Sequence, residues 1–261
     1  MHPILTHLLV LSACQLGLSP AHAQAQPASD WLLRGGVAAM AQPKYSGSDE
    51  IRMQALPLLE ARWRKNFFAG SLRGVGYETE LAEGVAVSLA LTADPHQRRR
   101  KDGARVQALD ELKLAPALRL GGELGMGPLF VNAMAHARLG RRGEPGARGS
   151  SVDLEAGYGL LPQPGLALGL GLTVKVMDAK LGQAMYGVSA AQAARSGLPA
   201  HGVGAGIASL GAFAQASYRI DADWLLFAKA GLSSLRGDAG ASPLVLKKRQ
   251  PSLALALSRS F

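Results

Sequence analysis

His136, Asn132 and Ser151 are the residues of this sequence whose types suggest covalent chemistry on a lipid or an ester. In such a reaction the histidine takes the proton of the serine nucleophile, so the two side chains must lie within hydrogen-bonding distance on the lipid-facing surface. His136 instead shares a strand face with Asn132, on the side that we expect to point inward. A packed or solvated histidine is therefore the favoured interpretation, and we predict no enzymatic activity and no catalytic residues.

The residue patterns of metal, nucleotide and nucleic-acid sites are missing from the sequence. Cys14 is the only cysteine, and the 32 glycines form no phosphate-binding loop. The 28 lysines and arginines against 19 acidic residues give a formal net charge of +9, which favours anionic partners. Since no helix-turn-helix, zinc or aromatic-basic motif accompanies the charge, nucleic acid is not the expected partner. We predict no metal and no cofactor.

Charged side chains of both signs share one face of several alternating segments. They can line a selective pore, or they can neutralise one another in a plugged interior, and the sequence leaves both possibilities open. The residues expected to line this interior are Glu78, Lys113, Arg119, Glu123, Asp153, Glu155, Lys175, Arg219 and Lys229.

The segments that must position these charges alternate with a period of two. Between residues 166 and 176, leucine or valine occupies every second position, while small or polar residues fill the gaps. Successive side chains of a strand point to opposite faces, so the pattern predicts a strand with one apolar and one small or polar wall. The same pattern recurs along the chain, which ends on Phe261.

A closed antiparallel transmembrane β-barrel explains this all-β pattern better than a water-soluble sandwich. A soluble sandwich would carry more lysine, glutamate and threonine on its second faces, whereas here alanine, glycine and serine fill them, as in a crowded interior. Short turns alternate with long polar loops, as the periplasmic turns and extracellular loops of such barrels do. Reading residues 67–81 as one strand gives eleven strands. Splitting them at Arg73–Gly76 gives twelve, which satisfies the even-number rule, so we predict twelve.

Basic residues gather in the predicted long loops. On the extracellular side they would meet outer-membrane lipids and the phosphates of lipopolysaccharide, although ordinary solvated loop charge is an equally good interpretation. The residues concerned are Arg98, Arg99, Arg100, Lys101, Arg141, Arg142, Lys247, Lys248 and Arg249.

The first residues have the composition of an export signal. An apolar stretch from Ile4 to Leu18 precedes Ala21-His22-Ala23, which fits a signal-peptidase site. The alternative is acylation at Cys14 after Leu11-Ser12-Ala13. We expect a signal peptide at 1–23, a short lead-in at 24–30 and a barrel at 31–261 in the outer membrane of a Gram-negative cell.

Several short motifs, in order along the whole mature chain, resemble the MltA-interacting protein (MipA/OmpV) family. The chain departs from the family pattern at Arg259, where an apolar or aromatic residue is usual. The motifs are Pro43-Lys44-Tyr45-Ser46-Gly47-Ser48, Leu56-Pro57, Tyr186-Gly187-Val188-Ser189, Ser196-Gly197-Leu198-Pro199 and Ser242-Pro243-Leu244-Val245, with the terminal Phe261.

This resemblance implies an outer-membrane barrel without catalytic activity. It implies a role as a scaffold that links a murein hydrolase, a lytic transglycosylase, to a murein synthase of the penicillin-binding class. A porin-like channel for small polar or anionic solutes is the alternative. An open lumen would favour transport, and a plugged lumen would favour the scaffold.

Overall fold

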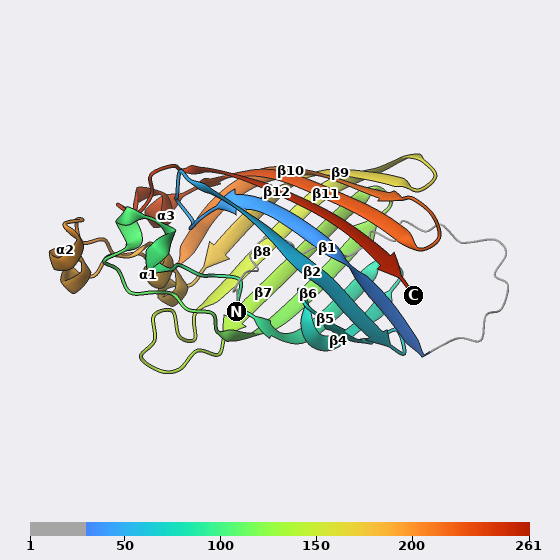
Figure 1. The fold of residues 1–261 in the computed structure, drawn as a ribbon, viewed down its shortest axis with the longest axis horizontal. Helices are drawn as coiled ribbons and strands as arrows, with labels where there is room; N and C mark the ends of the chain where they lie inside the picture. Colours follow the sequence, from blue (N-terminus) through green and yellow to red (C-terminus); the bar gives the residue numbers. More distant parts are fainter. Residues whose placement is uncertain (1–29) are drawn as a thin grey trace.

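The computed structural model describes residues 30–261, so the expected signal peptide, Cys14 and most of the lead-in lie outside the described residues. Twelve antiparallel strands follow one another around a closed barrel, and β1 pairs with β12 to close it (Figure 1). The predicted twelve-stranded barrel is therefore confirmed. The strands are β1 (Trp31–Pro43), β2 (Ile51–Trp63), β3 (Phe67–Gly70), β4 (Gly74–Ala82), β5 (Val85–Ala93), β6 (Pro116–Met126), β7 (Leu129–Arg138), β8 (Ser150–Gln163), β9 (Leu166–Met177), β10 (Gly206–Arg219), β11 (Trp224–Leu235) and β12 (Arg249–Ser260).

The outer wall of the barrel is apolar, as the alternation predicts. On β9, Leu170 and Leu172 are 61% and 67% exposed, while Lys175 on the opposite face is 8% exposed. A protein core cannot cover side chains that point away from a closed barrel, so this wall faces lipid. Among residues 30–261, no helix has the length and hydropathy needed to cross a bilayer, a finding that does not bear on strands.

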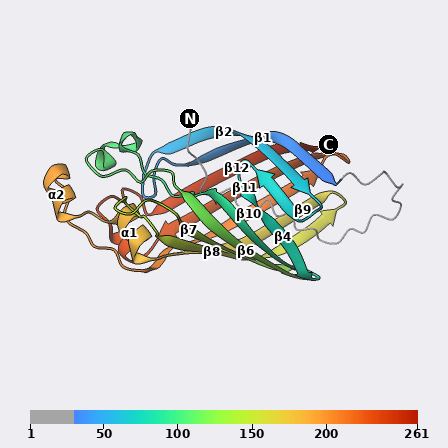
Figure 2. The ribbon, with the colours of Figure 1, turned by 90° about the horizontal axis from the view of Figure 1, so that it is seen from below.

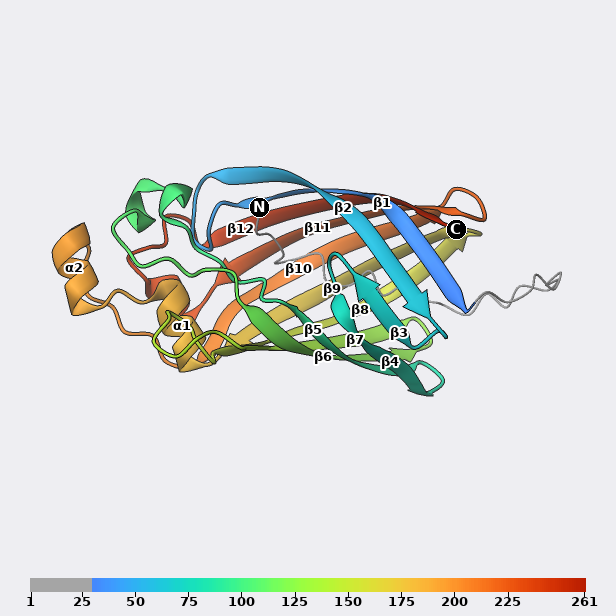
Figure 3. The ribbon, with the colours of Figure 1, turned by 60° about the horizontal axis from the view of Figure 1, so that its bottom comes forward.

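The split between β3 and β4 is confirmed, although it begins earlier than predicted. β3 ends at Gly70 and β4 begins at Gly74, so residues 71–73 form the break. Gly74 has φ +78°, and a side chain there would also meet the carbonyl oxygen of Leu91. Glycine is therefore required where the chain reverses direction. Figure 3 shows β3 as a short arrow beside the much longer β2.

Short turns lie at one end of the barrel, here called the turn end, and long connections lie at the other, the loop end (Figure 2). The turn end carries a ladder of aromatic rings, in which Trp31, Trp63, Phe67 and Tyr77 contact one another in sequence at centroid distances of 5.1–6.3 Å. The loop end carries the helical segments η1 (Arg100–Asp102), η2 (Ala104–Val106), α1 (Ala179–Tyr186), α2 (Ala190–Ser196) and α3 (Gly237–Ala241). The predicted alternation of short turns and long loops is confirmed, except that the three-residue break between β3 and β4 takes the place of a long loop.

Candidate functional site: a lidded lumen

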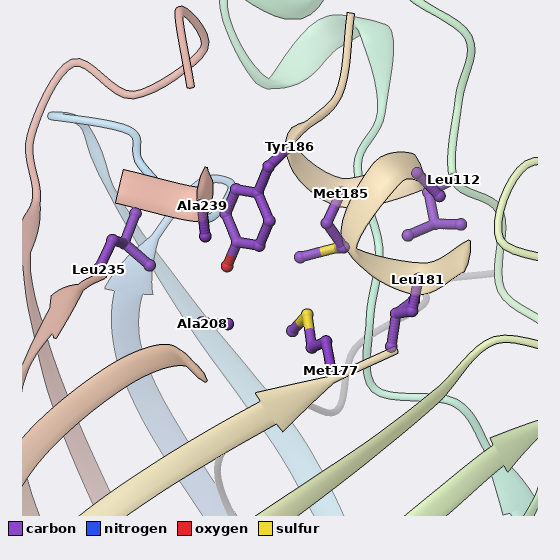
Figure 4. Packing of buried hydrophobic residues seen from close by; sticks show 9 residues of the cluster. Leu112, Met177, Leu181, Met185, Tyr186, Ala208, Leu235 and Ala239 are labelled. Atoms are coloured by element: carbon purple, nitrogen blue, oxygen red, sulfur yellow. The ribbon is translucent and has the colours of Figure 1, made fainter. Parts of the chain in front are cut away.

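The loops at the loop end pack together into one lid. One apolar cluster joins α1 to the ends of β9, β10 and β11 and to α3, and a second joins Tyr45, Val106, Leu109, Val188 and Leu244. Figure 4 shows Tyr186 of α1 beside Ala239 of α3, with Ala208 below the Tyr186 ring. We call this assembly the lid, made of residues 44–50, 94–115, 178–205 and 236–248.

Tyr186 is the central residue of the lid. Its side chain is 2% exposed, its hydroxyl lies 2.7 Å from Ser46 Oγ, and its carbonyl oxygen accepts a hydrogen bond from Ser242 Oγ. Burial raises the pKa of Tyr186 to about 12, because the phenolate would lose its hydration. Tyr45 donates to the carbonyl oxygen of Leu244 at 3.1 Å. These contacts bring together three motifs that lie far apart in the sequence.

A buried ion cluster anchors the loop between β5 and β6 inside the barrel mouth. Asp94, fully buried, accepts hydrogen bonds from Arg138 of β7, from the backbone N–H of His96 and, at 2.7 Å, from His96 Nδ1. Burial alone would raise the pKa of Asp94, but hydrogen bonding and charge from His96, with the charge of Arg138, hold it well below its usual range. His96 Nε2 lies 3.3 Å from Lys175 Nζ of β9. The loop therefore reaches across the lumen.

A cavity of about 190 Å³ lies beneath the lid. Its wall carries two ion pairs: Lys175 Nζ lies 2.9 Å from Asp153 Oδ1, and Lys229 Nζ lies 2.7 Å from Glu155 Oε1. The second pair joins β11 to β8. Because β9 and β10 lie between these strands in the wall, the pair crosses part of the lumen. The cavity wall thus carries these four charges in neutral pairs, among apolar residues such as Met40, Phe213 and Leu232.

Aromatic side chains fill the lumen below the cavity. Phe130 and Phe213 are both nearly fully buried, with ring centroids 6.2 Å apart. A Cβ at Gly157 would lie 2.5 Å from the Phe130 ring, and one at Gly171 would lie 2.6 Å from the Phe213 ring. Because these two glycines are opposite each other on β8 and β9, they create the space that the rings occupy. This is the crowded interior that the small residues of the sequence predict.

A second ion-pair network occupies the lumen beside β3. Arg73 bonds to Glu78, and Arg62 lies 2.8 Å from Glu60 and 3.2 Å from Glu78. Arg119 of β6 is 2% exposed next to this group. The lumen of the described chain therefore holds charges of both signs that are largely paired with one another.

A family model for MltA-interacting protein MipA matches residues 35–261. The chain belongs to this family. No curated protein matches the sequence. Four of the motifs that carried the resemblance to the MipA family, scattered over 200 positions, meet in the lid, whereas Leu56-Pro57 lies on β2 and Phe261 lies at the turn end.

Solved barrels resemble the chain only distantly. The KdgM porin in complex with disordered oligogalacturonate is 10% identical and covers 87% of this chain and 99% of its own, with a TM-score of 0.47. The COG4313 outer membrane channel from Pseudomonas putida F1 is 12% identical and covers 94% and 100%, with a TM-score of 0.43. These values say nothing about what this MipA-family chain binds or transports.

Seven of the nine charges expected in the lumen of this MipA-family barrel lie there, and four of them form the pairs Lys175–Asp153 and Lys229–Glu155, but two lie elsewhere. Lys113 lies in the loop before β6 with an exposed side chain, because β6 begins three residues later than the alternation suggests. Arg219 is exposed at the turn end of β10. Lys113 is therefore not a lumen residue. Glu78, Arg119, Glu123, Asp153, Glu155, Lys175 and Lys229 are half-buried or buried on the inner strand faces.

The expected basic loops lie at the loop end, with one correction. Arg98 is 3% exposed and donates hydrogen bonds to the carbonyl oxygens of Met185 and Asp110, so it holds the lid together and is out of reach of an external anion. Arg99 is half-buried against Asp102. The remaining basic residues of the set are exposed: Arg100, Lys101, Arg141, Arg142, Lys247, Lys248 and Arg249.

His136 and Ser151 are directly opposite each other on β7 and β8, with both side chains buried in the lumen. His136 Nδ1 and Ser151 Oγ nevertheless each lack a hydrogen-bond partner among the described residues. The pair is thus not arranged as a base and its nucleophile.

The residues that sequence reasoning missed are Asp94 and His96, which lie in a loop, and Tyr186 as the centre of the lid. The spacing Asp94-Pro95-His96 after a strand was the available signal for the first two.

Proposed function

We propose that this protein is a non-catalytic scaffold of the Gram-negative outer membrane that holds a lytic transglycosylase and a penicillin-binding synthase together. In this proposal the barrel is oriented with its turn end toward the periplasm and its lid toward the outside of the cell, as in barrels of this class. The observation that carries the proposal is the obstructed lumen: the lid lies across its loop end, and the paired charges and buried aromatic side chains occupy part of it below. Such a barrel is better suited to present a surface than to conduct.

The turn between β2 and β3 offers the partner enzymes a rigid basic contact. Arg64 and Lys65 both adopt positive φ, 49° and 64°, within the three-residue turn that joins Trp63 to Phe67. The Arg64 guanidinium lies 4.7 Å from the centroid of the Trp63 ring, which limits its motion. Both side chains are exposed. We propose that they meet acidic surfaces of the murein enzymes.

Affinity purification from solubilised membranes tests the scaffold. The intact protein should recover both murein enzymes, and Arg64→Glu with Lys65→Glu should lower that recovery several-fold. The same charge reversal at the loop end, Lys247→Glu with Lys248→Glu, is the matched control and should leave recovery unchanged. Recovery of neither enzyme by the intact protein would contradict the proposal.

A channel for small polar or anionic solutes is the second candidate, and the cavity beneath the lid favours it. A solute that entered from the loop end would meet the carboxylates of Asp153 and Glu155 and the amines of Lys175 and Lys229. Planar-bilayer recordings decide between the candidates. Conductance that rises when Tyr186→Ala loosens the lid would support the channel, and conductance at background level in both proteins would eliminate it.

A further inference from the structure

The barrel wall has a gap between β2 and β5. β2 is 13 residues long, but its neighbour β3 has only 4, and the two pair only over Glu60–Trp63 of β2. Within residues 30–261, no strand pairs with the other edge of Ile51–Leu58, and β5 likewise extends beyond β4 after Leu91. Figure 3 shows β2 continuing alone past β3 toward the loop end.

Specific contacts border this gap above and below. Below it, Ser71 of the β3–β4 break donates from its backbone N–H to the Leu59 carbonyl oxygen and from Oγ to the Pro57 carbonyl oxygen. Above it, Arg52 of β2 bonds to Asp102 of η1, which holds the loop that leaves β5 against the start of β2. We call the space between these contacts the wall gap.

The β2 edge presents peptide groups to the wall gap. The backbone C=O of Leu59 points toward β3, where it accepts a hydrogen bond from Ser71. Because peptide groups two residues apart in a strand point to the same edge, those of Pro57, Ala55 and Met53 point to this edge as well. Pro57 has no N–H to leave unpaired, which suits a strand edge. Ala55 and Met53 each present an N–H and a C=O. In hydrocarbon such groups are costly unless something with hydrogen-bonding atoms covers them.

The lower part of the inner side of the wall gap is apolar, whereas nearer the loop end the inward side chains of β2 are Gln54 and Arg52. Leu58 and Leu72 are buried in one cluster with Met40, and Leu56 packs against it. Leu56 and Leu58 are the residues that interrupt the polar face of β2 in the sequence. An alkyl chain that lies along β2 would therefore find apolar contacts where other parts of the lumen offer charges.

Cations lie above the wall gap, on its loop-end side. Arg99 and Arg52 both contact the buried Asp102, so that carboxylate is fully neutralised. Arg100, Lys101 and Arg105 are exposed on the same segment and make no ion pair among the described residues. The Glu111 carboxylate accepts a hydrogen bond from the Arg100 backbone N–H, and Arg105 donates to the Pro243 carbonyl oxygen. With three exposed cations against this one carboxylate, the segment keeps an excess of positive charge next to the exposed strand edge.

We infer that the wall gap binds a phosphorylated glucosamine lipid with hydroxyacyl chains, the lipid A class, from the outer leaflet. Its phosphate lies against Arg100 and Lys101, one acyl chain lies along β2, and its amide and hydroxyl groups pair with the peptide groups of Met53 and Ala55. This lipid supplies both the charge and the hydrogen-bonding atoms that the site lacks. The inference rests on the outward orientation of the loops in the proposed function, and not on the murein enzymes.

Photocrosslinking of the full chain in bilayers tests this site. A benzophenone amino acid replaces Met53, which is 82% exposed, and in a second protein replaces Leu172, 67% exposed on fully paired β9. In phosphatidylcholine nanodiscs containing lipid A, crosslinking to lipid A at position 53 should exceed that at position 172 several-fold. Arg100→Glu with Lys101→Glu should abolish the excess, and the matched reversal Arg141→Glu with Arg142→Glu should not.

Equal crosslinking at the two positions would overturn the inference, and so would a crosslink from position 53 to a second copy of the chain. An equal excess with phosphatidylglycerol in place of lipid A would also overturn it, because that lipid lacks the amide and hydroxyacyl groups. None of these outcomes alters the recovery of murein enzymes through the turn end, so failure here is distinguishable from failure of the scaffold.

Discussion

The wall from β8 to β11 and the wall from β3 to β5 differ in height. The four strands of the first wall, β8 to β11, have 14, 12, 14 and 12 residues and pair with each other over nearly their whole length, so we call it the tall wall. The three strands of the second wall, β3 to β5, have 4, 9 and 9 residues, and we call it the short wall. In the tall wall the backbone supplies the hydrogen bonds, so side chains such as Lys229 and Glu155 contact each other across the lumen. In the short wall, individual side chains replace missing backbone pairing.

The largest effect of a single substitution is expected beside the short wall. Asp94→Asn removes the charge that Arg138 and His96 contact, and it leaves a buried guanidinium without a counterion. We expect the free energy of unfolding to fall by about 4 kcal/mol. Urea titration of the detergent-solubilised barrel measures this change. Arg195→Gln, in the half-exposed pair with Asp110, is the control and should cost less than about 1 kcal/mol.

The lid joins the two walls, and its stability should depend on alkaline pH. Because burial raises the pKa of Tyr186 to about 12 from 10.0, its contribution is complete below pH 10 and is lost between pH 10 and about 12. The difference amounts to ~3 kcal/mol. The tyrosinate absorbance of the intact protein minus that of Tyr186→Phe reports the ionisation of this phenol alone. Proteolysis of residues 178–205 reports opening of the lid. A difference titration centred at pH 10 would contradict the prediction.

The tall wall should tolerate the loss of a charged side chain better than the short wall tolerates Asp94→Asn. Lys229→Met leaves Glu155 without its amine, but the cavity beneath the lid lets water reach the carboxylate. We expect a loss of about 2 kcal/mol, half that of Asp94→Asn. The same urea titration measures it. A loss equal to that of Asp94→Asn would remove the contrast between the walls.

The smallest effect tests the backbone contrast itself. Ser71→Ala deletes the hydroxyl that bonds to Pro57 and Leu59 at the β2 edge, and we expect a loss of about 1 kcal/mol. Ser233→Ala on β11 is the matched control, since β11 pairs on both sides at this position, and should change little. Hydrogen exchange of the β2 amides should rise only in the first variant.

The local patterns of the chain determine the strands and their two faces. Alternating leucines, small inward residues and turn lengths are enough to predict twelve strands, because the side-chain period of a strand is a property of the backbone. They also place Asp153, Glu155, Lys175 and Lys229 in one lumen. They misplace Lys113, since the start of β6 depends on where the preceding loop is held rather than on alternation.

Which side chains meet is decided by the closed barrel and its loops. Tyr45, Tyr186 and Leu244 lie about 200 positions apart at the extremes, and only closure of β1 on β12 brings their loops into one lid. The same holds for Arg52 and Asp102, and for the length of β3, which no local pattern specifies. The sequence by itself determines that a lipid-facing barrel forms, because burial of alternating faces is a local property. Only the tertiary structure decides that its lumen is lidded and its wall has a gap, because both depend on contacts between distant segments.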